Sequence, residues 1–196
     1  MSALRPDLAI IATHVDPGSR VLDIGCGDGT LLAALRDARR CDARGMEIEP
    51  HNVAACVARG LSVIQGDADE DLAFYPDASF DYAILSETLQ TMVRPDRVLE
   101  ELLRIGKRAF VSFPNFAHWR GRGSFLLGGG VAGKRALAVG GDGKAHNPPP
   151  TLADFSAFVA ERGITVERSW FLSGDREITT GMANLRAEHA IFLISR

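Results

Sequence analysis

A glycine-rich segment behind a short apolar run constrains the fold of this 196-residue chain more than any other feature. Residues 20–24 (Arg-Val-Leu-Asp-Ile) are typical of a buried strand. Three glycines follow at alternate positions, Gly25, Gly27 and Gly29. Glycines let the backbone turn sharply and let a ligand approach it closely. A helix is predicted to begin near Thr30, and the free N–H groups of its N-terminus would point at whatever is bound.

The alternation of strand and helix continues along most of the chain. Further strands are predicted at residues 43–48, 61–65, 80–85, 108–113, 164–172 and 189–194. Three helices are predicted to start at prolines, Pro6, Pro50 and Pro95. Strands that alternate with helices predict βαβ units and therefore an α/β fold with a parallel sheet. The last two strands are expected to form an antiparallel pair at the edge of this sheet.

The alternation is interrupted between residues 121 and 150, where many glycines precede Pro148-Pro149-Pro150. This segment is too long for an ordinary connection between two elements. It is interpreted as a functional or mobile loop, and the alternative is a linker without a function of its own. The length of the chain predicts one domain over residues 1–196 that contains this loop.

Composition argues against several classes of site and partner. The net charge of −3 disfavours a nucleic-acid surface, which is usually basic. The five histidines are scattered, without cysteine or carboxylate partners at ligand spacing, so no metal site is expected. The three cysteines, none in a C-x-x-C pair, predict reduced thiols and a cytoplasmic location. Neither a signal peptide nor a membrane-spanning run is expected.

The spacing of the glycines narrows the choice of ligand. Dinucleotide sites use G-x-G-x-x-G, with a pyrophosphate resting on the helix N-terminus. Here the pattern is G-x-G-x-G, with Asp23 two positions before the first glycine. A carboxylate at this point suits a cationic group better than a pyrophosphate, which disfavours a dinucleotide-dependent oxidoreductase. S-adenosylmethionine carries an ammonium and a sulfonium, and Asp23 is predicted to bind its amino-acid end, directly or through water.

Acidic residues at the ends of the next two strands extend the predicted adenosyl site. Glu47, with Glu49 as the alternative, would accept hydrogen bonds from the ribose hydroxyls. Asp67 would accept one from the adenine amino group, with Ala68 beside it, unless this aspartate only shapes a turn. The other predicted contacts with the ligand are Gly25, Cys26, Gly27, Gly29 and Ser86.

Candidates for catalysis follow the fourth and fifth predicted strands. Glu87 either contacts a substrate or caps a helix. Asn115 and His118 lie at the functional edge of the sheet, or else belong to a helix that packs Phe116 and Trp119 into the core. His118 is the histidine best placed for acid–base work. Methyl transfer can rest mainly on positioning, so no catalytic residue is assigned.

Two sets of residues resemble known families. The run Asp23-Ile24-Gly25-Cys26-Gly27-Asp28-Gly29, with Glu47 and Asp67, resembles class I S-adenosylmethionine-dependent methyltransferases. That resemblance implies a Rossmann-like, doubly wound, mostly parallel sheet of seven strands. A narrower resemblance, to the methionine biosynthesis protein MetW family, is carried by Leu4-Arg5-Pro6-Asp7-Leu8 and by residues 18–23, 85–90 and 112–119.

The narrower resemblance implies S-adenosylmethionine or S-adenosylhomocysteine as ligand and a homoserine O-acyltransferase as partner, whose reaction the protein supports. It implies no methyl acceptor. The resemblance weakens after Trp119, because residues 140–150 lack the aromatic residues of the family pattern, although Thr151-Leu152-Ala153-Asp154-Phe155 keeps its Thr-x-x-Asp-Phe helix start. Two functions stay open: support of homoserine acyl transfer, and methylation of a small molecule held by the loop at 121–150.

Overall fold

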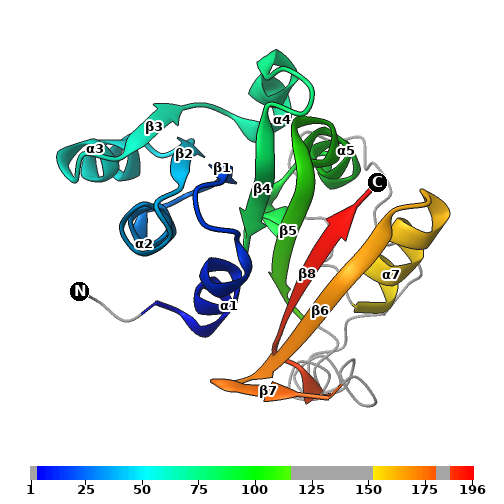
Figure 1. Ribbon diagram of the computed structural model, residues 1–196. Coiled ribbons are helices and arrows are strands. Elements are labelled where there is room, and N and C mark those ends of the chain that lie inside the picture. Colours follow the sequence, from blue (N-terminus) through cyan, green and yellow to red (C-terminus); the bar gives the residue numbers. More distant parts are fainter. Residues whose placement is uncertain (1–3, 116–151, 180–185) are drawn as a thin grey trace, which may run out of the picture.

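The computed structural model describes residues 4–115, 152–179 and 186–196. They form one mixed sheet with helices on both faces (Figure 1). The strands are β1 (Arg20–Ile24), β2 (Asp42–Glu47), β3 (Ser62–Gln65), β4 (Phe80–Ser86), β5 (Gly106–Pro114), β6 (Thr165–Ser173), β7 (Arg176–Ile178) and β8 (His189–Ser195). The helices are α1 (Pro6–His14), α2 (Thr30–Arg39), α3 (Pro50–Ala58), α4 (Ala68–Asp71), α5 (Pro95–Ile105) and α7 (Leu152–Glu161), with 3-10 turns η1 (Leu72–Phe74) and η2 (Leu89–Thr91).

The strands lie in the order β3-β2-β1-β4-β5-β8-β6-β7. The first five are parallel, while β8, β6 and β7 pair antiparallel. The α/β fold with a mostly parallel sheet is therefore confirmed, and so is the antiparallel pairing of β6 with β8. Two details differ from the prediction. The short strand β7 is an eighth strand, and β8 lies inside the sheet, where its run of five buried residues from Ala190 to Ile194 is covered by β5 and β6.

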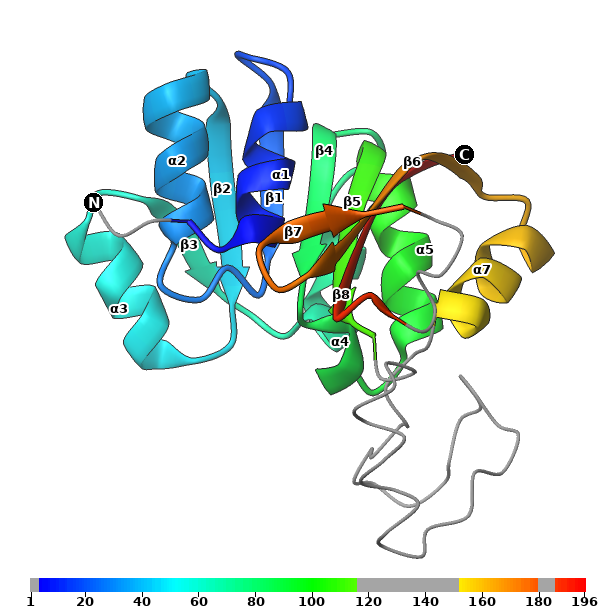
Figure 2. The same ribbon diagram turned by 90° about the horizontal axis from the view of Figure 1, so that it is seen from below.

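Alternating side chains of the central strands divide the core between the two faces of the sheet. Leu22 and Ile24 of β1 belong to a cluster with α5 and α7, on one face. Val21 belongs to a cluster with α1 and α2, on the other. Figure 2 shows α1 and α2 side by side along the sheet. Both faces of β1 are thus buried, which explains the apolar residues Val21, Leu22 and Ile24 on its two sides.

The topology brings the loops after β1, β2 and β4 together. From β1 the chain winds outward through β2 and β3, and then returns to β4 on the other side of β1. The carboxyl ends of β1 and β4 therefore flank the switch point at which ligands bind in open α/β sheets. None of the described helices is long and apolar enough to cross a bilayer. The single domain with its loop at 121–150 stays a prediction, since that loop lies outside the described residues.

Candidate functional site

The loop after β1 is built so that only glycine fits at its turning points. Gly25, Gly27 and Gly29 all have positive φ angles, of 69°, 55° and 74°. The N–H groups of Gly25 and Cys26 donate to the Met46 carbonyl at 2.8 and 3.2 Å, which fixes the loop against β2. A Cβ atom on Gly25 would lie 2.7 Å from the Thr88 side chain, whereas one on Gly27 would meet nothing within 4 Å. The loop is therefore closed toward the protein at Gly25 and open at Gly27.

Glu47, at the end of β2, holds the open part of this loop. Its Oε2 accepts a hydrogen bond from the Gly27 N–H at 2.7 Å, and its Oε1 accepts one from the Glu49 N–H at 2.9 Å. The side chain of Glu49, by contrast, is exposed and lies 3.7 Å from His51. Of the two acids considered for the ribose, Glu47 is therefore the one next to the glycine loop. Its contact with a ribose stays a prediction.

Asp23 is a buried carboxyl group, with only 3% of the residue exposed. Burial, and then the negative charge of Glu47, raise its pKa to about 7, while Arg5 acts in the opposite direction. No side chain among the described residues hydrogen-bonds to the Asp23 carboxylate. A cationic ligand group at this position would supply the missing partner, so the site fits the ammonium of S-adenosylmethionine.

The other predicted contacts with the ligand differ in where their side chains lie. Asp67 caps α4, since its Oδ1 accepts from the Asp69 N–H at 2.9 Å, and Ala68 begins that helix. Cys26 is buried among Leu32, Cys56 and Leu61. Its side chain therefore packs into the core, and a contact between Cys26 and a ligand stays a prediction.

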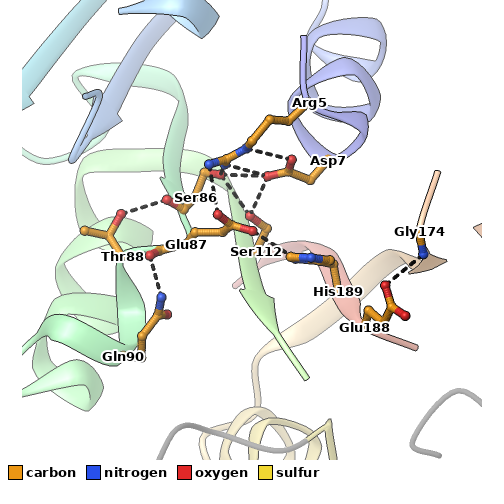
Figure 3. A network of polar contacts seen from close by, with 10 residues as sticks. All are labelled: Arg5, Asp7, Ser86, Glu87, Thr88, Gln90, Ser112, Gly174, Glu188 and His189. Atoms are coloured by element: carbon orange, nitrogen blue, oxygen red, sulfur yellow. Dashed lines mark hydrogen bonds and ion pairs between the residues drawn. The ribbon is translucent and has the colours of Figure 1, made fainter. Parts of the chain in front are cut away.

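Ser86, the last residue of β4, and Glu87 after it form a polar network with the start of α1 (Figure 3). Arg5 Nη2 lies 3.0 Å from Asp7 Oδ2 and donates to Ser86 Oγ at 3.2 Å. Ser86 Oγ in turn donates to Asp7 Oδ2 at 3.0 Å, and Ser112 Oγ on β5 donates to Ser86 Oγ at 3.0 Å. The predicted ligand residue Ser86 is thus held by groups from two other parts of the chain, the start of α1 and β5.

Glu87 is not a helix cap. Its Oε2 lies 2.8 Å from Arg5 Nη1, and its Oε1 lies 2.9 Å from Nδ1 of His189, the first residue of β8. Its φ angle is 54°, in the left-handed region that non-glycine residues rarely adopt, and its N–H donates to the Ser112 carbonyl at 2.9 Å. Strained backbone of this kind concentrates at functional sites.

The pair of His189 and Glu87 is expected to make stability depend on pH. The hydrogen bond to Glu87 is the main reason that the pKa of His189 is raised above 6.5. The stabilisation is therefore complete below the unfolded value of about 6.5 and is lost as pH rises through the folded pKa. Since both groups are partly solvated, this stabilisation amounts to about 0.3–1 kcal/mol.

Urea unfolding between about pH 5 and pH 9 tests this expectation. The His189→Gln and Glu87→Gln variants should show the same flattened dependence of stability on pH, and the double variant should not flatten it further. Single variants that keep the wild-type profile would contradict it.

The remaining catalytic candidates are Asn115, which the structure describes, and His118, which it does not. Asn115 is buried, and its Nδ2 donates to the Ala187 carbonyl at 3.0 Å, while its N–H donates to the Glu188 carbonyl at 2.7 Å. It therefore ties the end of β5 to the segment before β8. His118, together with the loop at 121–150, lies outside the described residues.

Several residues near the site escaped sequence reasoning. Arg5 and Asp7 entered only through a family resemblance, and His189 only as the start of a strand. A charged pair flanking the proline of a helix start was the available signal for Arg5 and Asp7. Ile48, which follows Glu47 and is 55% exposed, is a large apolar side chain at the carboxyl end of a strand. The available signal for Ile48 was an apolar residue directly after the acidic residue Glu47.

Comparison with known sequences identifies one family. The family model described as "Methionine biosynthesis protein MetW" matches residues 5–194. The "Bifunctional methionine biosynthesis protein MetXA/MetW" of Rhodopirellula baltica is 34% identical over an alignment that covers 98% of this chain. The chain spans only 33% of the length of that relative.

Solved structures agree on the fold. A S-adenosylmethionine-dependent methyltransferase from Archaeoglobus fulgidus superimposes with a TM-score of 0.69 at 16% identity, over 96% of this chain and 91% of the other. The [4+2]-cyclase SpnF superimposes with a TM-score of 0.65 at 20% identity, over 96% of this chain and 80% of the other. The fold is therefore that of class I methyltransferases, and one of its neighbours is described as a cyclase.

Proposed function

Because the chain belongs to the family of the methionine biosynthesis protein MetW, we propose that it binds S-adenosylmethionine or S-adenosylhomocysteine and thereby supports methionine biosynthesis. The observation that carries this proposal is the buried Asp23 carboxylate beside the open glycine loop. A carboxylate taken out of water needs a cationic partner, and the amino-acid end of the adenosyl ligand brings one.

The charges around Asp23 support a particular orientation of the ligand. Arg5 lowers the pKa of Asp23, so its guanidinium acts on that carboxylate through space. A ligand that carries both an ammonium and a carboxylate finds opposite charges in Asp23 and Arg5. Glu47 would then accept from the ribose hydroxyls, Asp67 from the adenine amino group, and the exposed Ile48 would cover one face of the adenine. When bound, S-adenosylmethionine would supply an activated methyl group.

We propose a homoserine O-acyltransferase as the partner protein. The Rhodopirellula baltica relative supports this, because its description joins MetXA and MetW in one polypeptide, of which this chain matches a third. Two functions that share one polypeptide in a relative are candidates for physical association when they are separate chains. Binding of the adenosyl ligand would then change the association with the acyltransferase, so that the partner responds to the concentration of the adenosyl compound.

Methylation of a small molecule is the second candidate function. The network of Arg5, Ser86, Glu87 and His189 favours it, since polar groups stand beside the proposed ligand at the carboxyl end of β4. The fold by itself does not decide between the two, because unrelated chemistry is hosted by one fold. Formation of S-adenosylhomocysteine in the presence of a metabolite extract would support this function. A broad panel of metabolites without any turnover would remove it.

Thermal unfolding is expected to reveal the ligand directly. At a ligand concentration a hundredfold above Kd, binding stabilises the folded state by about 2.7 kcal/mol. For a chain of this size, that corresponds to a rise in Tm of roughly 5–10 °C. S-adenosylmethionine and S-adenosylhomocysteine should both give this shift, and NAD should give none. A shift with NAD alone would overturn the choice of ligand, and the absence of any shift would overturn the site.

Association with the acyltransferase is expected in a pull-down with purified proteins. The bound fraction should change when S-adenosylhomocysteine is added, because the proposal couples the two events. Gly27→Ala, which is designed to block the ligand, should keep the association but lose its response to the ligand. No association under either condition would remove the partner from the proposal.

A further inference from the structure

A cavity of about 170 Å³ lies beside the proposed adenosyl site. It is bounded by the start of α1, the end of β4 and the neighbouring ends of β6 and β8, and its polar lining is Arg5, Asp7, Glu87, Asp175, Glu188 and His189. Pockets for drug-sized ligands measure about 300–1,000 Å³. This cavity is therefore suited to a metabolite with only a few non-hydrogen atoms. Ser86, a predicted contact of the adenosyl ligand, bonds to two residues of the cavity lining, Arg5 and Asp7.

The charges of the cavity call for a ligand with a positive group. Its lining holds four carboxylates against one arginine and one histidine. Arg5 is paired with Asp7 and Glu87, and His189 is paired with Glu87. Asp175, which is exposed in the turn between β6 and β7, forms no ion pair with another described residue. The carboxylate of Asp175 in this small concave site attracts a cation, such as an amine.

His189, by contrast, favours a ligand that also carries a negatively charged group. Its Nδ1 lies 2.9 Å from Glu87 Oε1, so the imidazole is fixed in one orientation with Nε2 on the side of the ring away from Glu87. The hydrogen bond to Glu87 raises the pKa of His189, with Asp7 and Glu188 adding to it and burial opposing it. In the protonated imidazolium, which this pairing favours, Nε2 has a proton to donate, and none of the described residues accepts it. An anionic ligand oxygen is a suitable acceptor.

The backbone at Glu87 shows that this orientation is imposed by the fold. Glu87 has a φ angle of 54°. One oxygen of its carboxylate pairs with Arg5 and the other pairs with His189. Its N–H is also bonded, to the Ser112 carbonyl. The imidazole of His189 is thus presented to the cavity by a preorganised partner rather than by a mobile surface carboxylate.

We propose that this cavity binds a small zwitterionic amino acid next to the adenosyl ligand. The ligand carboxylate accepts a hydrogen bond from Nε2 of His189, and its ammonium lies toward Asp175. A simple amine would leave the His189 donor without an acceptor, and a simple carboxylic acid would leave Asp175 without a cationic partner. The inference rests on the proposed function in one respect, since the adenosyl ligand is expected in the neighbouring site.

Isothermal titration with three related probes tests this proposal. L-homoserine, the substrate of the proposed partner enzyme, carries both charges. 3-Aminopropan-1-ol lacks its carboxylate, and 4-hydroxybutanoate lacks its ammonium. With and without S-adenosylhomocysteine, L-homoserine should bind, and each of the other two should bind at least about tenfold more weakly. The ¹⁵N signal of His189 Nε2, identified by its loss in His189→Gln, should shift with L-homoserine.

Two variants and one matched control complete the test. His189→Gln and Asp175→Asn should each weaken L-homoserine at least about tenfold. Glu177→Gln removes the same charge two residues from Asp175, outside the cavity lining, and should leave the affinity unchanged. Equal binding of 3-aminopropan-1-ol, or no binding of L-homoserine to a protein that still binds S-adenosylhomocysteine, overturns the cavity proposal alone. Binding of L-homoserine that depends on His189, in a protein that ignores both adenosyl ligands, supports the cavity and overturns the proposed function.

Discussion

Gly29→Ala is expected to destabilise the protein by about 2–5 kcal/mol. Two costs add up at this position. The φ angle of 74° lies in the left-handed region, which penalises a side chain whatever the space around it. The new Cβ would also lie 2.5 Å from Leu61 Cδ1 and 2.7 Å from Cys56 Sγ. Both neighbours are buried in one small cluster, so they have little room to move aside.

Urea unfolding of three alanine variants separates these costs. Gly18 has a φ angle of 77° with nothing within 4 Å of a Cβ, so Gly18→Ala should show the backbone cost alone, about 1–2 kcal/mol. Gly27→Ala, also in open space, should cost about the same but should abolish the Tm shift with S-adenosylhomocysteine. If Gly29→Ala were no more destabilising than Gly18→Ala, the tight packing of the loop against α3 would be contradicted.

Asp23→Asn is expected to stabilise the ligand-free protein above neutral pH. The folded pKa of about 7 exceeds the usual value near 3.9, so the folded state holds a proton that the unfolded state has released. Stability therefore falls as pH rises from about 4 to about 7, and stays low above that. Asparagine cannot ionise, which removes this penalty. The gain at about pH 8 should be roughly 2–4 kcal/mol, and close to zero at about pH 4.

The same variant is expected to bind the adenosyl ligand more weakly. Without the carboxylate, the ammonium of S-adenosylmethionine is left unpaired in a buried site, which should weaken binding roughly 10–100-fold. Unfolding curves across this pH range and a calorimetric titration measure the two effects. Asp42→Asn, which removes an exposed ion-pair partner of Arg44, is the matched control. It should change the free energy of unfolding by less than about 1 kcal/mol and leave the affinity for the adenosyl ligand unchanged. An Asp23→Asn variant that is less stable at high pH, or that binds as tightly as the wild type, would contradict this role of Asp23.

Local sequence was sufficient to predict the elements whose pattern is regular. β1 begins and ends where the apolar run indicates, and α2, α3 and α5 start at the predicted residues. β7 was missed because Arg176–Ile178 is only three residues long and contains a single apolar side chain. The inner position of β8 was missed because strand order depends on pairing between distant segments, which periodicity does not report.

The same distinction explains what was predicted of the site. The glycine loop and the acids at the strand ends lie within short, continuous segments, so their positions followed from the sequence. The cluster of Arg5, Glu87 and His189 joins residues from the two ends and the middle of the chain. His189 reaches the carboxyl edge of the parallel strands only because β8 runs antiparallel to β5, with His189 opposite Pro114. That register is a property of the whole sheet.

The place of β8 also has a consequence for synthesis on the ribosome. In the described part of the chain, β6 and β7 connect to the rest of the sheet only through β8, which is made after both. The five parallel strands can assemble while translation continues, but β6 must wait with its edge unpaired until residues 189–195 emerge. A nascent chain stalled before those residues should therefore be cleaved by proteases in β6 and be protected in β1 and β4. Chaperones that bind unpaired strands would then bind this protein chiefly at β6 and β7.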